Sequence, residues 1–365
     1  MNLFLYGTLR DSALLEIVLG HAPGEDRLRP AQLSDHAVLA VQGERFPMIA
    51  EAPGHTAAGV VLTDVTDDEN ARLRYYEGGF DYGVRSVTLS DTIQAFVFFP
   101  EGGWRGNGAW SLERWQNDWG PIARAASREQ MDHFGHWTPQ EMLARTPMTL
   151  HRAAARVEAG KIPADPRSTN VEILDRSRSY TYFFALDDIK VRVPQRDGTQ
   201  GPVLDRSVFF VGDAAVVLPY DPVADTVLLT EQFRAPVWLN GDGAPWVREP
   251  VAGLVDPGET AEQAARREAQ EEAGIALGAL HKVGAAYSST GSSTEFVHMF
   301  VGLADLSDAE GRGGGVPEEG EDIATIVLPF NDFITGVDNG LYKDMPLLTC
   351  AHWLARHRAG LRANA

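Results

Sequence analysis

The clearest structural signal in the chain is the stretch "GLVDPGETAEQAARREAQEEAGI" (Gly253–Ile275), which predicts a helix with marked ends. Thr260 is a good N-cap with Gln263 three residues later for a capping box, and Gly274 suits the position after the last turn. Strand-like runs such as "AAVVLPYD" and "STEFVHMFVGL" stand before and after it. Strands with interleaved helices predict an α/β (α+β) domain with a mixed sheet between helical layers.

Three acids of this predicted helix, Glu268, Glu271 and Glu272, fall in one stripe at about 100° per residue. Like charges three or four residues apart destabilise an isolated helix by roughly 0.2–0.5 kcal/mol per pair. The acids share their side with alanines suited to close packing, and a partly buried carboxylate cluster needs cations. Oxygen ligands suit Mg²⁺ or Mn²⁺, so the stripe predicts a divalent-metal site. The alternative is a solvated face with pairs such as Arg267–Glu271.

The same stretch satisfies the pattern G-x5-E-x7-R-E-U-x-E-E-x-G-U at every position, where U is apolar. It therefore resembles the Nudix box. The resemblance implies a Nudix α/β/α sandwich that hydrolyses a diphosphate linked to another group, with Arg267 and Glu259 holding the loop–helix–loop together. At matching positions the implied metal ligands are Glu268, Glu271 and Glu272, of which Glu268 and Glu272 also count as catalytic.

Further segments between about residues 170 and 360, among them "PWVREPVAGLVDPGE" and "EEGEDI", are similar to ADP-ribose pyrophosphatases of that superfamily. This similarity implies two or three Mg²⁺ or Mn²⁺ ions and hydrolysis of ADP-ribose to AMP and ribose 5-phosphate. It adds the Ala252 carbonyl and Glu321 to the metal ligands. Glu319 is the expected base, with Glu318 as its alternative. The implied substrate-binding residues are Arg206 and Arg234.

Two positions depart from the pattern of the ADP-ribose group. Ser289 and Thr290 stand where that group usually has a proline, and Ser207 replaces an acidic residue after Arg206. Both departures concern substrate selection, so a nucleotide sugar such as GDP-mannose stays an alternative substrate. A non-catalytic nucleotide sensor is a further alternative, against which the intact box argues.

The N-terminal stretches "LFLYGTLRD" (Leu3–Asp11) and "LRYYEGGFDYGVRSVTL" (Leu73–Leu89) resemble the gamma-glutamylcyclotransferase-like, or AIG2-like, family. The resemblance implies a small mixed, β-barrel-like fold in which Glu77 is the acid/base that releases 5-oxoproline from gamma-glutamyl compounds. The alternative is a retained scaffold for dimer contacts or ligand sensing. The combination of both domains resembles some bacterial tellurite-resistance-associated proteins. The turn expected to bind the gamma-glutamyl group consists of Tyr6, Gly7, Thr8 and Leu9.

These resemblances predict a gamma-glutamylcyclotransferase-like domain over residues 1–105 and a Nudix domain over 167–365. Helical spacing from Ser111 and the stretch "KIPADPRSTN" predict a helical connector and linker over 106–166. The Gly-rich "EGGWRGNGAW" breaks the strand pattern between them. We expect a homodimer from the family resemblance alone.

The composition limits the partners of the chain. Its 365 residues carry a net charge of −19, which disfavours nucleic acid and anionic membranes. No stretch reaches 18 apolar residues, and the N-terminus has no basic leader, so we expect neither a membrane span nor a signal peptide. A single cysteine, Cys350, excludes an internal disulfide and is expected in the core, which suits the cytoplasm.

Overall fold

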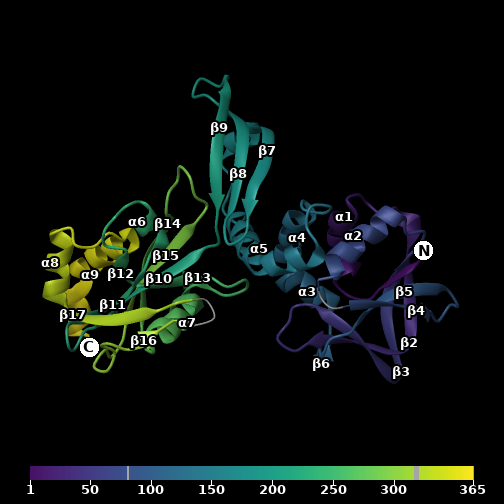
Figure 1. The fold of residues 1–365 in the computed structure, drawn as a ribbon, viewed down its shortest axis with the longest axis horizontal. Helices are drawn as coiled ribbons and strands as arrows, with labels where there is room; N and C mark the ends of the chain where they lie inside the picture. The colour runs from purple at the N-terminus through teal and green to yellow at the C-terminus, as the bar shows by residue number, and fades with distance from the viewer. Residues whose placement is uncertain (80–81, 316–319, 365) are drawn as a thin grey trace. The chain divides into compact units, whose positions relative to one another are not determined.

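The computed structural model describes residues 1–79, 82–315 and 320–364 and divides into two compact units (Figure 1). The first unit comprises Met1–Thr169 and Thr181–Phe184, and the second comprises Asn170–Tyr180 and Ala185–Ala365. Each unit has a sheet and a hydrophobic core of its own.

The first unit contains a six-stranded sheet in the order β4-β5-β1-β3-β2-β6. The expected barrel-like form is not reached: among the described residues the edge strands β4 and β6 pair only inward, so the sheet is open. The glycine-rich stretch expected to break the pattern contributes β6, because its backbone pairs with β2. The strands are β1 (Leu3–Leu5), β2 (Leu28–Val41), β3 (Pro47–Leu62), β4 (Tyr82–Thr88), β5 (Gln94–Pro100) and β6 (Gly106–Ala109).

Helices cover this sheet, and the helices of residues 112–159, where a connector is expected, belong to this same unit. Leucines of α1, Leu14 and Leu15, are buried against β1 and β3 residues, and Trp115 closes the same cluster. Arg152 is 3% exposed and donates to Glu129 and to the Phe183 carbonyl, so a buried ion pair fixes the connector. The α-helices are α1 (Ser12–Leu19), α2 (Asp67–Glu77), α3 (Leu112–Asp118), α4 (Gly120–Met131) and α5 (Pro139–Ala159), and the 3₁₀ turns are η1 (Thr8–Arg10), η2 (Glu25–Arg27) and η3 (Pro166–Asn170).

The second unit contains an eight-stranded mixed sheet. Its main path is β14-β15-β10-β11-β17-β16, with β12 paired to β11 and β13 paired to β10. The β10–β15 pair is parallel and the other pairs are antiparallel. Its strands are β10 (Ala214–Asp221), β11 (Thr226–Phe233), β12 (Trp246–Glu249), β13 (Val251–Leu254), β14 (Leu280–Tyr287), β15 (Phe296–Leu303), β16 (Gly313–Gly314) and β17 (Ile323–Pro329).

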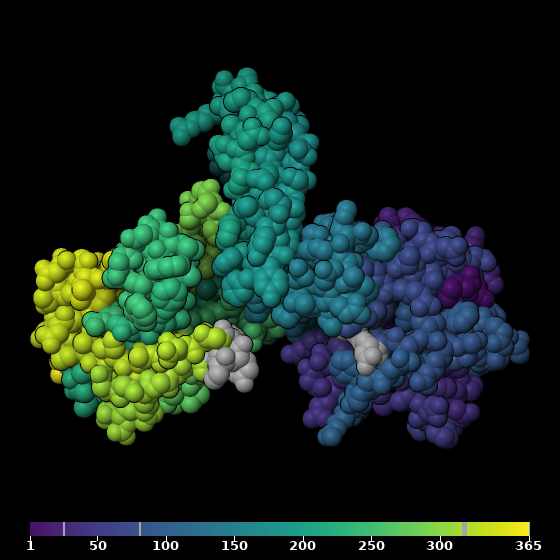
Figure 2. Space-filling view, in the orientation of Figure 1, coloured from purple at the N-terminus to yellow at the C-terminus, as the bar shows by residue number. Residues whose placement is uncertain are grey.

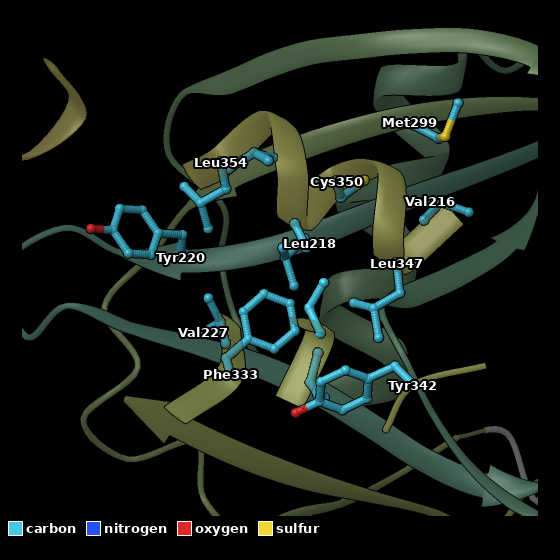
Figure 3. Close-up of a cluster of buried hydrophobic side chains, with 14 of the residues drawn as sticks. Val216, Leu218, Tyr220, Val227, Met299, Phe333, Tyr342, Leu347, Cys350 and Leu354 are labelled. Atoms are coloured by element: carbon cyan, nitrogen blue, oxygen red, sulfur yellow. The ribbon is translucent and has the colours of Figure 1, made fainter. Parts of the chain in front are cut away.

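Helices lie on both faces of this sheet, which confirms the predicted α/β/α sandwich. Alternate residues of β10 point to opposite faces: Ala215 and Val217 pack with the alanines of α7, and Leu218 packs with α8 and α9 (Figure 3). Cys350 of α9 lies fully buried in the cluster that Leu218 forms with α8 and α9, as predicted. The helices are α6 (Ala235–Leu239), α7 (Ala261–Ala273), α8 (Phe330–Asp338) and α9 (Met345–Ala363).

A separate three-stranded sheet precedes this sandwich in the chain. Its strands are β7 (Glu172–Thr181), β8 (Ala185–Pro194) and β9 (Gln200–Phe210). Asp187 is fully buried between the guanidinium groups of Arg176 and Arg178, which hold its pKa below the usual range despite its burial. In the described part of the chain, no helix is long and apolar enough to cross a membrane.

Candidate active sites

Helix α7 has the ends that the sequence predicts. The Gln263 amide donates to Thr260 Oγ1 at 3.2 Å, and the Thr260 amide donates to Gln263 Oε1 at 2.8 Å. Gly274 ends the helix in the left-handed region at φ 63°. The helix packs closely against β13, because a Cβ on Gly253 would lie 1.9 Å from Glu268 Oε1. The capped helix therefore presents its acids next to the sheet.

The three acids of α7 do not share one environment. Glu272 is 2% exposed and Glu268 is 13% exposed, whereas 40% of the Glu271 side chain is exposed. Glu272 accepts the Ala252 amide at 3.2 Å, which ties it to β13. Two of the three predicted carboxylates therefore face the interior, and the third lies at the rim.

Arg267 is the cation next to these acids. Its Nη1 donates to Glu268 Oε1 at 2.6 Å and to Glu271 Oε2 at 3.0 Å. Its Nη2 donates to Glu259 at 3.1 Å and to the Leu254 carbonyl at 2.9 Å. Arg267 thereby joins the loop before α7 to the helix, which is the arrangement that the resemblance implies. With Asp256 at 3.8 Å from its Nε, one guanidinium is shared by four carboxylates, so negative charge remains in excess.

Burial and the neighbouring acids raise the pKa values of the two inner carboxylates, Glu268 and Glu272. Burial, followed by the charges of Glu268 and Glu321, raises the pKa of Glu272 to about 8, although the Ala252 amide and Arg234 oppose this. Burial also raises the pKa of Glu268 to about 7 against the opposing effect of Arg267. Buried carboxylates that are costly to ionise together favour a bound cation, and an oxygen-only donor set fits Mg²⁺ or Mn²⁺. The residues present therefore fit a divalent ion.

The remaining predicted ligands lie around these two acids in different ways. Glu321 lies close enough to raise the pKa of both Glu268 and Glu272. Glu318 and Glu319, the candidate bases, lie outside the described residues. Within the described ranges, no three His, Cys, Asp or Glu side chains already converge as a metal cage. The ligand set therefore stays a prediction, supported by proximity rather than by a preformed cage.

The two arginines expected at the substrate lie on different sheets. Arg234 follows β11, and its Nε donates to Glu249 Oε2 at 2.8 Å. Arg206 lies exposed on β9, where its Nη1 donates to the Asp205 carbonyl at 2.7 Å. In the described part of the chain, no hydrogen bond or ion pair joins Arg206 to α7. The structure therefore places Arg234 close enough to Glu272 for its charge to lower the pKa of that acid. Arg206 stays on the three-stranded sheet.

Sequence reasoning missed Glu249, the partner of Arg234. The pair forms because β12 runs antiparallel to β11, with Glu249 opposite Thr230. No local pattern indicates that register.

Ser207 stands where the family pattern has an acidic residue after Arg206. It donates its hydroxyl to Asp188 Oδ1 at 2.5 Å, and Asp188 lies directly opposite on β8. A carboxylate thus stands one strand away from the position where the family pattern has an acid.

In the first unit, the residues expected to bind and convert a gamma-glutamyl group lie just after β1 and at the end of α2. Glu77 is the last residue of α2, and burial raises its pKa to about 7. Burial, together with the nearby Tyr82 and Glu77, raises the pKa of Tyr6 well above its usual value. Tyr6 donates to the Phe98 carbonyl, and Tyr82 donates to the Pro47 carbonyl, both at 3.0 Å. A partly buried acid beside two phenols is thus present in this unit.

The Tyr-Gly-Thr-Leu turn lies beside these phenols. Gly7 precedes η1 and packs so closely that a Cβ there would lie 2.9 Å from Pro47 Cγ. Thr8 begins η1, and Leu9 is buried in the core. The structure therefore brings Tyr6, Glu77 and Tyr82 together and places the turn next to them through Tyr6.

Comparisons with known proteins agree with both halves of this architecture. The NUDIX domain model matches residues 211–346, and the model of "Gamma-glutamyl cyclotransferase, AIG2-like" matches residues 3–117. An ADP-ribose pyrophosphatase of Escherichia coli (strain K12) is 34% identical over 201 residues, which are 55% of this chain and 95% of that protein. A GDP-mannose pyrophosphatase of Pectobacterium atrosepticum is 36% identical over 178 residues, 48% of this chain and 90% of that protein.

A solved structure of an ADP compounds hydrolase is also similar, with a TM-score of 0.40 and 18% identity over 51% of this chain and 95% of that one. The sandwich and its capped, carboxylate-bearing helix define a hydrolase domain of the Nudix pyrophosphatase class. The chain belongs to the Nudix family and joins this domain to an N-terminal AIG2-like domain.

Proposed function

We propose that the C-terminal domain hydrolyses ADP-ribose to AMP and ribose 5-phosphate in the presence of Mg²⁺ or Mn²⁺. The observation that carries this proposal is the pair Glu268 and Glu272, which are buried and have raised pKa values although the charges of Arg267 and Arg234 oppose the rise. A structural ion pair would match its charges, whereas this arrangement retains an uncompensated negative charge. Similarity to ADP-ribose pyrophosphatases over most of their length supports the substrate.

The residues divide the work as follows. The Ala252 carbonyl and the carboxylates of Glu268, Glu271, Glu272 and Glu321 would hold two or three divalent ions. These ions would supply charge neutralisation of the diphosphate and a more acidic water. Arg234, whose Nε and Nη2 pair with Glu249, would bind the diphosphate through its remaining N–H groups. Glu319 would accept the proton of the attacking water, and Glu319→Gln should slow turnover while leaving substrate binding intact. Equal turnover in that variant would transfer the role to Glu318.

The test is a screen of nucleoside diphosphate derivatives with the full-length protein and Mg²⁺ or Mn²⁺. Release of AMP from ADP-ribose, at a higher kcat/KM than for any nucleotide sugar, is the expected result. A preference for GDP-mannose would favour the alternative substrate, which similarity to GDP-mannose pyrophosphatases also supports. Tight binding of ADP-ribose without AMP release would indicate a sensor and overturn the proposal.

A second function is favoured by the acid of the first unit. Glu77 combines a pKa raised to about 7 with the phenols of Tyr6 and Tyr82, and such an acid can accept and return a proton near neutral pH. We propose that this domain converts gamma-glutamyl compounds to 5-oxoproline, with the α-amine attacking the γ-carbonyl and an amine leaving. A panel of gamma-glutamyl amino acids and amines, assayed for 5-oxoproline, tests this. No release from any member would favour a sensing or scaffold role.

Homodimerisation and a cytoplasmic location stay proposals. Large apolar side chains are exposed on β7–β9, the teal segment of Figure 2, among them Ile173 at 64%, Leu174 at 47% and Val203 at 43%. Apolar area of this kind supports contact with a second copy, and the position of Arg206 on that sheet would let it act at the partner's site. Light scattering on the purified protein tests this, since a monomer at micromolar concentration would contradict it.

A further inference from the structure

The segment Arg312–Gly315, which contains β16, lies directly against the C-terminal end of α7. The Gly315 amide donates to the Glu271 carbonyl at 3.2 Å, and Arg312 Nη1 donates to the Gly274 carbonyl at 3.3 Å. The last carbonyls of a helix have no partner within the helix. This segment therefore satisfies one of them, that of Glu271, and it is also tied to Gly274, the residue that follows the helix.

Gly314 makes the closest approach of this segment. A Cβ built there would lie 1.7 Å from the main-chain oxygen of Glu272 and 2.4 Å from its carbonyl carbon. These are backbone atoms of the helix, so they cannot rotate away as the end of a side chain can. Only a residue without a Cβ allows β16 to lie this close. Gly313 differs, since a Cβ on it would meet nothing within 4 Å.

The next residue continues the contact toward the acid. Gly315 has φ +97°, which favours glycine, and a Cβ there would lie 2.7 Å from the Cβ of Glu321. Glu321 in turn acts electrostatically on Glu268 and Glu272. The backbone of Gly314 thus touches the main chain of Glu272, and Gly315 touches the side chain of Glu321.

We propose that Gly314 is a positioning residue that sets the separation between Glu272 and Glu321 by letting β16 rest on the main-chain oxygen of Glu272. This role lies outside the Nudix box; it rests on the divalent-ion site of the proposed function, and on ADP-ribose hydrolysis only for its kinetic test. A side chain at this position would push the segment away from α7 and carry Glu321 with it. A misplacement of about 1 Å in a reacting arrangement can cost on the order of 100-fold in rate.

The experiment compares Gly314→Ala with Gly313→Ala in the full-length protein. Binding of Mn²⁺, followed by electron paramagnetic resonance of the free ion, is the first measurement, and ADP-ribose turnover is the second. We expect Gly314→Ala to weaken Mn²⁺ binding about 10-fold and to lower kcat about 100-fold. Gly313→Ala should stay within about twofold of the parent protein in both. Equal Mn²⁺ affinity in the two variants would overturn the proposal, whether or not the parent hydrolyses ADP-ribose.

A double-mutant cycle separates positioning from a general structural effect. In a Glu321→Ala background, adding Gly314→Ala should change Mn²⁺ affinity by less than about twofold, because the residue through which Gly314 acts is gone. A full additional loss would show that Gly314 does not act through Glu321. If circular dichroism shows that Gly314→Ala does not fold, Arg312→Gln removes the other tie without adding atoms. It should weaken Mn²⁺ binding about threefold, and unchanged binding would count against the proposal.

Discussion

Helices α2 and α7 begin with the same kind of N-cap, and each has an acid in its last turn, but the surroundings of these two acids differ. Each starts at a threonine in a complete capping box, Thr66 with Glu69 and Thr260 with Gln263. Each holds a carboxylate near its C-terminal end, where the helix dipole disfavours negative charge. Burial is the main cause of the raised pKa values, about 7 for Glu77 and about 8 for Glu272.

The difference is the number of acids in each place. Among the described residues, no other acid is a cause of the raised pKa of Glu77, and this partly buried carboxyl can avoid the cost of burial by keeping a proton. Glu272 is flanked by Glu268 and Glu321, and both neighbours raise its pKa further. A single acid near neutrality is suited to proton transfer, whereas a cluster of acids is suited to a divalent cation. Similar helices are thus specialised by what surrounds their last turn.

The largest expected effect comes from removing one charge of the α7 cluster. Glu272→Gln should lower ADP-ribose hydrolysis on the order of 1,000-fold, because it removes a proposed ligand of the divalent ions that would neutralise charge on the diphosphate. Release of 5-oxoproline should stay unchanged. Coupled detection of AMP measures the first activity. Glu262→Gln, an exposed acid in the first turn of the same helix, is the matched control. More than a tenth of the parent rate in Glu272→Gln would contradict the assignment.

The converse change should affect the other domain alone. Glu77→Gln should lower 5-oxoproline release by roughly 100-fold or more, the scale of general acid–base catalysis, and leave ADP-ribose hydrolysis unaltered. Chromatographic assay of 5-oxoproline and of AMP on the same preparation measures both. Glu16→Gln, on α1 of the same unit, serves as the control. Loss of both activities together would indicate that the two domains are not independent.

Much of α7 could be predicted because its signals are local. Thr260, Gln263 and Gly274 mark the helix within one stretch, and the acids fall on the face that the alanines indicate. The burial of Glu272 and the exposure of Glu271 could not be separated in advance. They differ because the sheet covers one side of the stripe only, and β13 reaches Glu272 through the Ala252 amide.

Features that depend on pairing between distant segments could not be predicted. The long hairpin of β2 and β3 lacks a clean alternation of apolar residues, and much of it is exposed. The ion pair between Arg234 and Glu249 depends on the register of β11 and β12. The fit of Gly314 against the Glu272 carbonyl depends on how β16 meets α7. In each case the deciding contact joins residues with no sequence pattern in common.

The single and clustered acids should also differ in how stability depends on pH. The folded pKa of Glu77, about 7, lies above its unfolded value of about 4.5, so the folded state binds the proton more tightly between these values. Stability relative to Glu77→Gln should therefore fall as the pH rises from about 4.5 to 7, by at most about 3 kcal/mol. Urea unfolding of both proteins at several pH values, followed for the N-terminal transition, measures this.

Divalent ions provide the control for that pH dependence. Addition of Mg²⁺ should leave the difference between parent and Glu77→Gln unchanged. It should stabilise the C-terminal transition, because ions that bind the folded state shift unfolding by mass action. A stability difference that is flat from pH 5 to 8 would show that Glu77 is not protonated in the folded protein near neutrality.

The smallest expected effects test the feature that the two helices share. Thr260→Ala and Thr66→Ala should each lower the free energy of unfolding of their own unit by about 1 kcal/mol, because each removes the hydroxyl that accepts the amide three residues later. Urea unfolding with separate probes for the two units measures both. The corresponding serine variants keep that hydroxyl and should lose much less. Serine variants as unstable as the alanine variants would indicate that the threonine methyl group, rather than the cap, stabilises these helix ends.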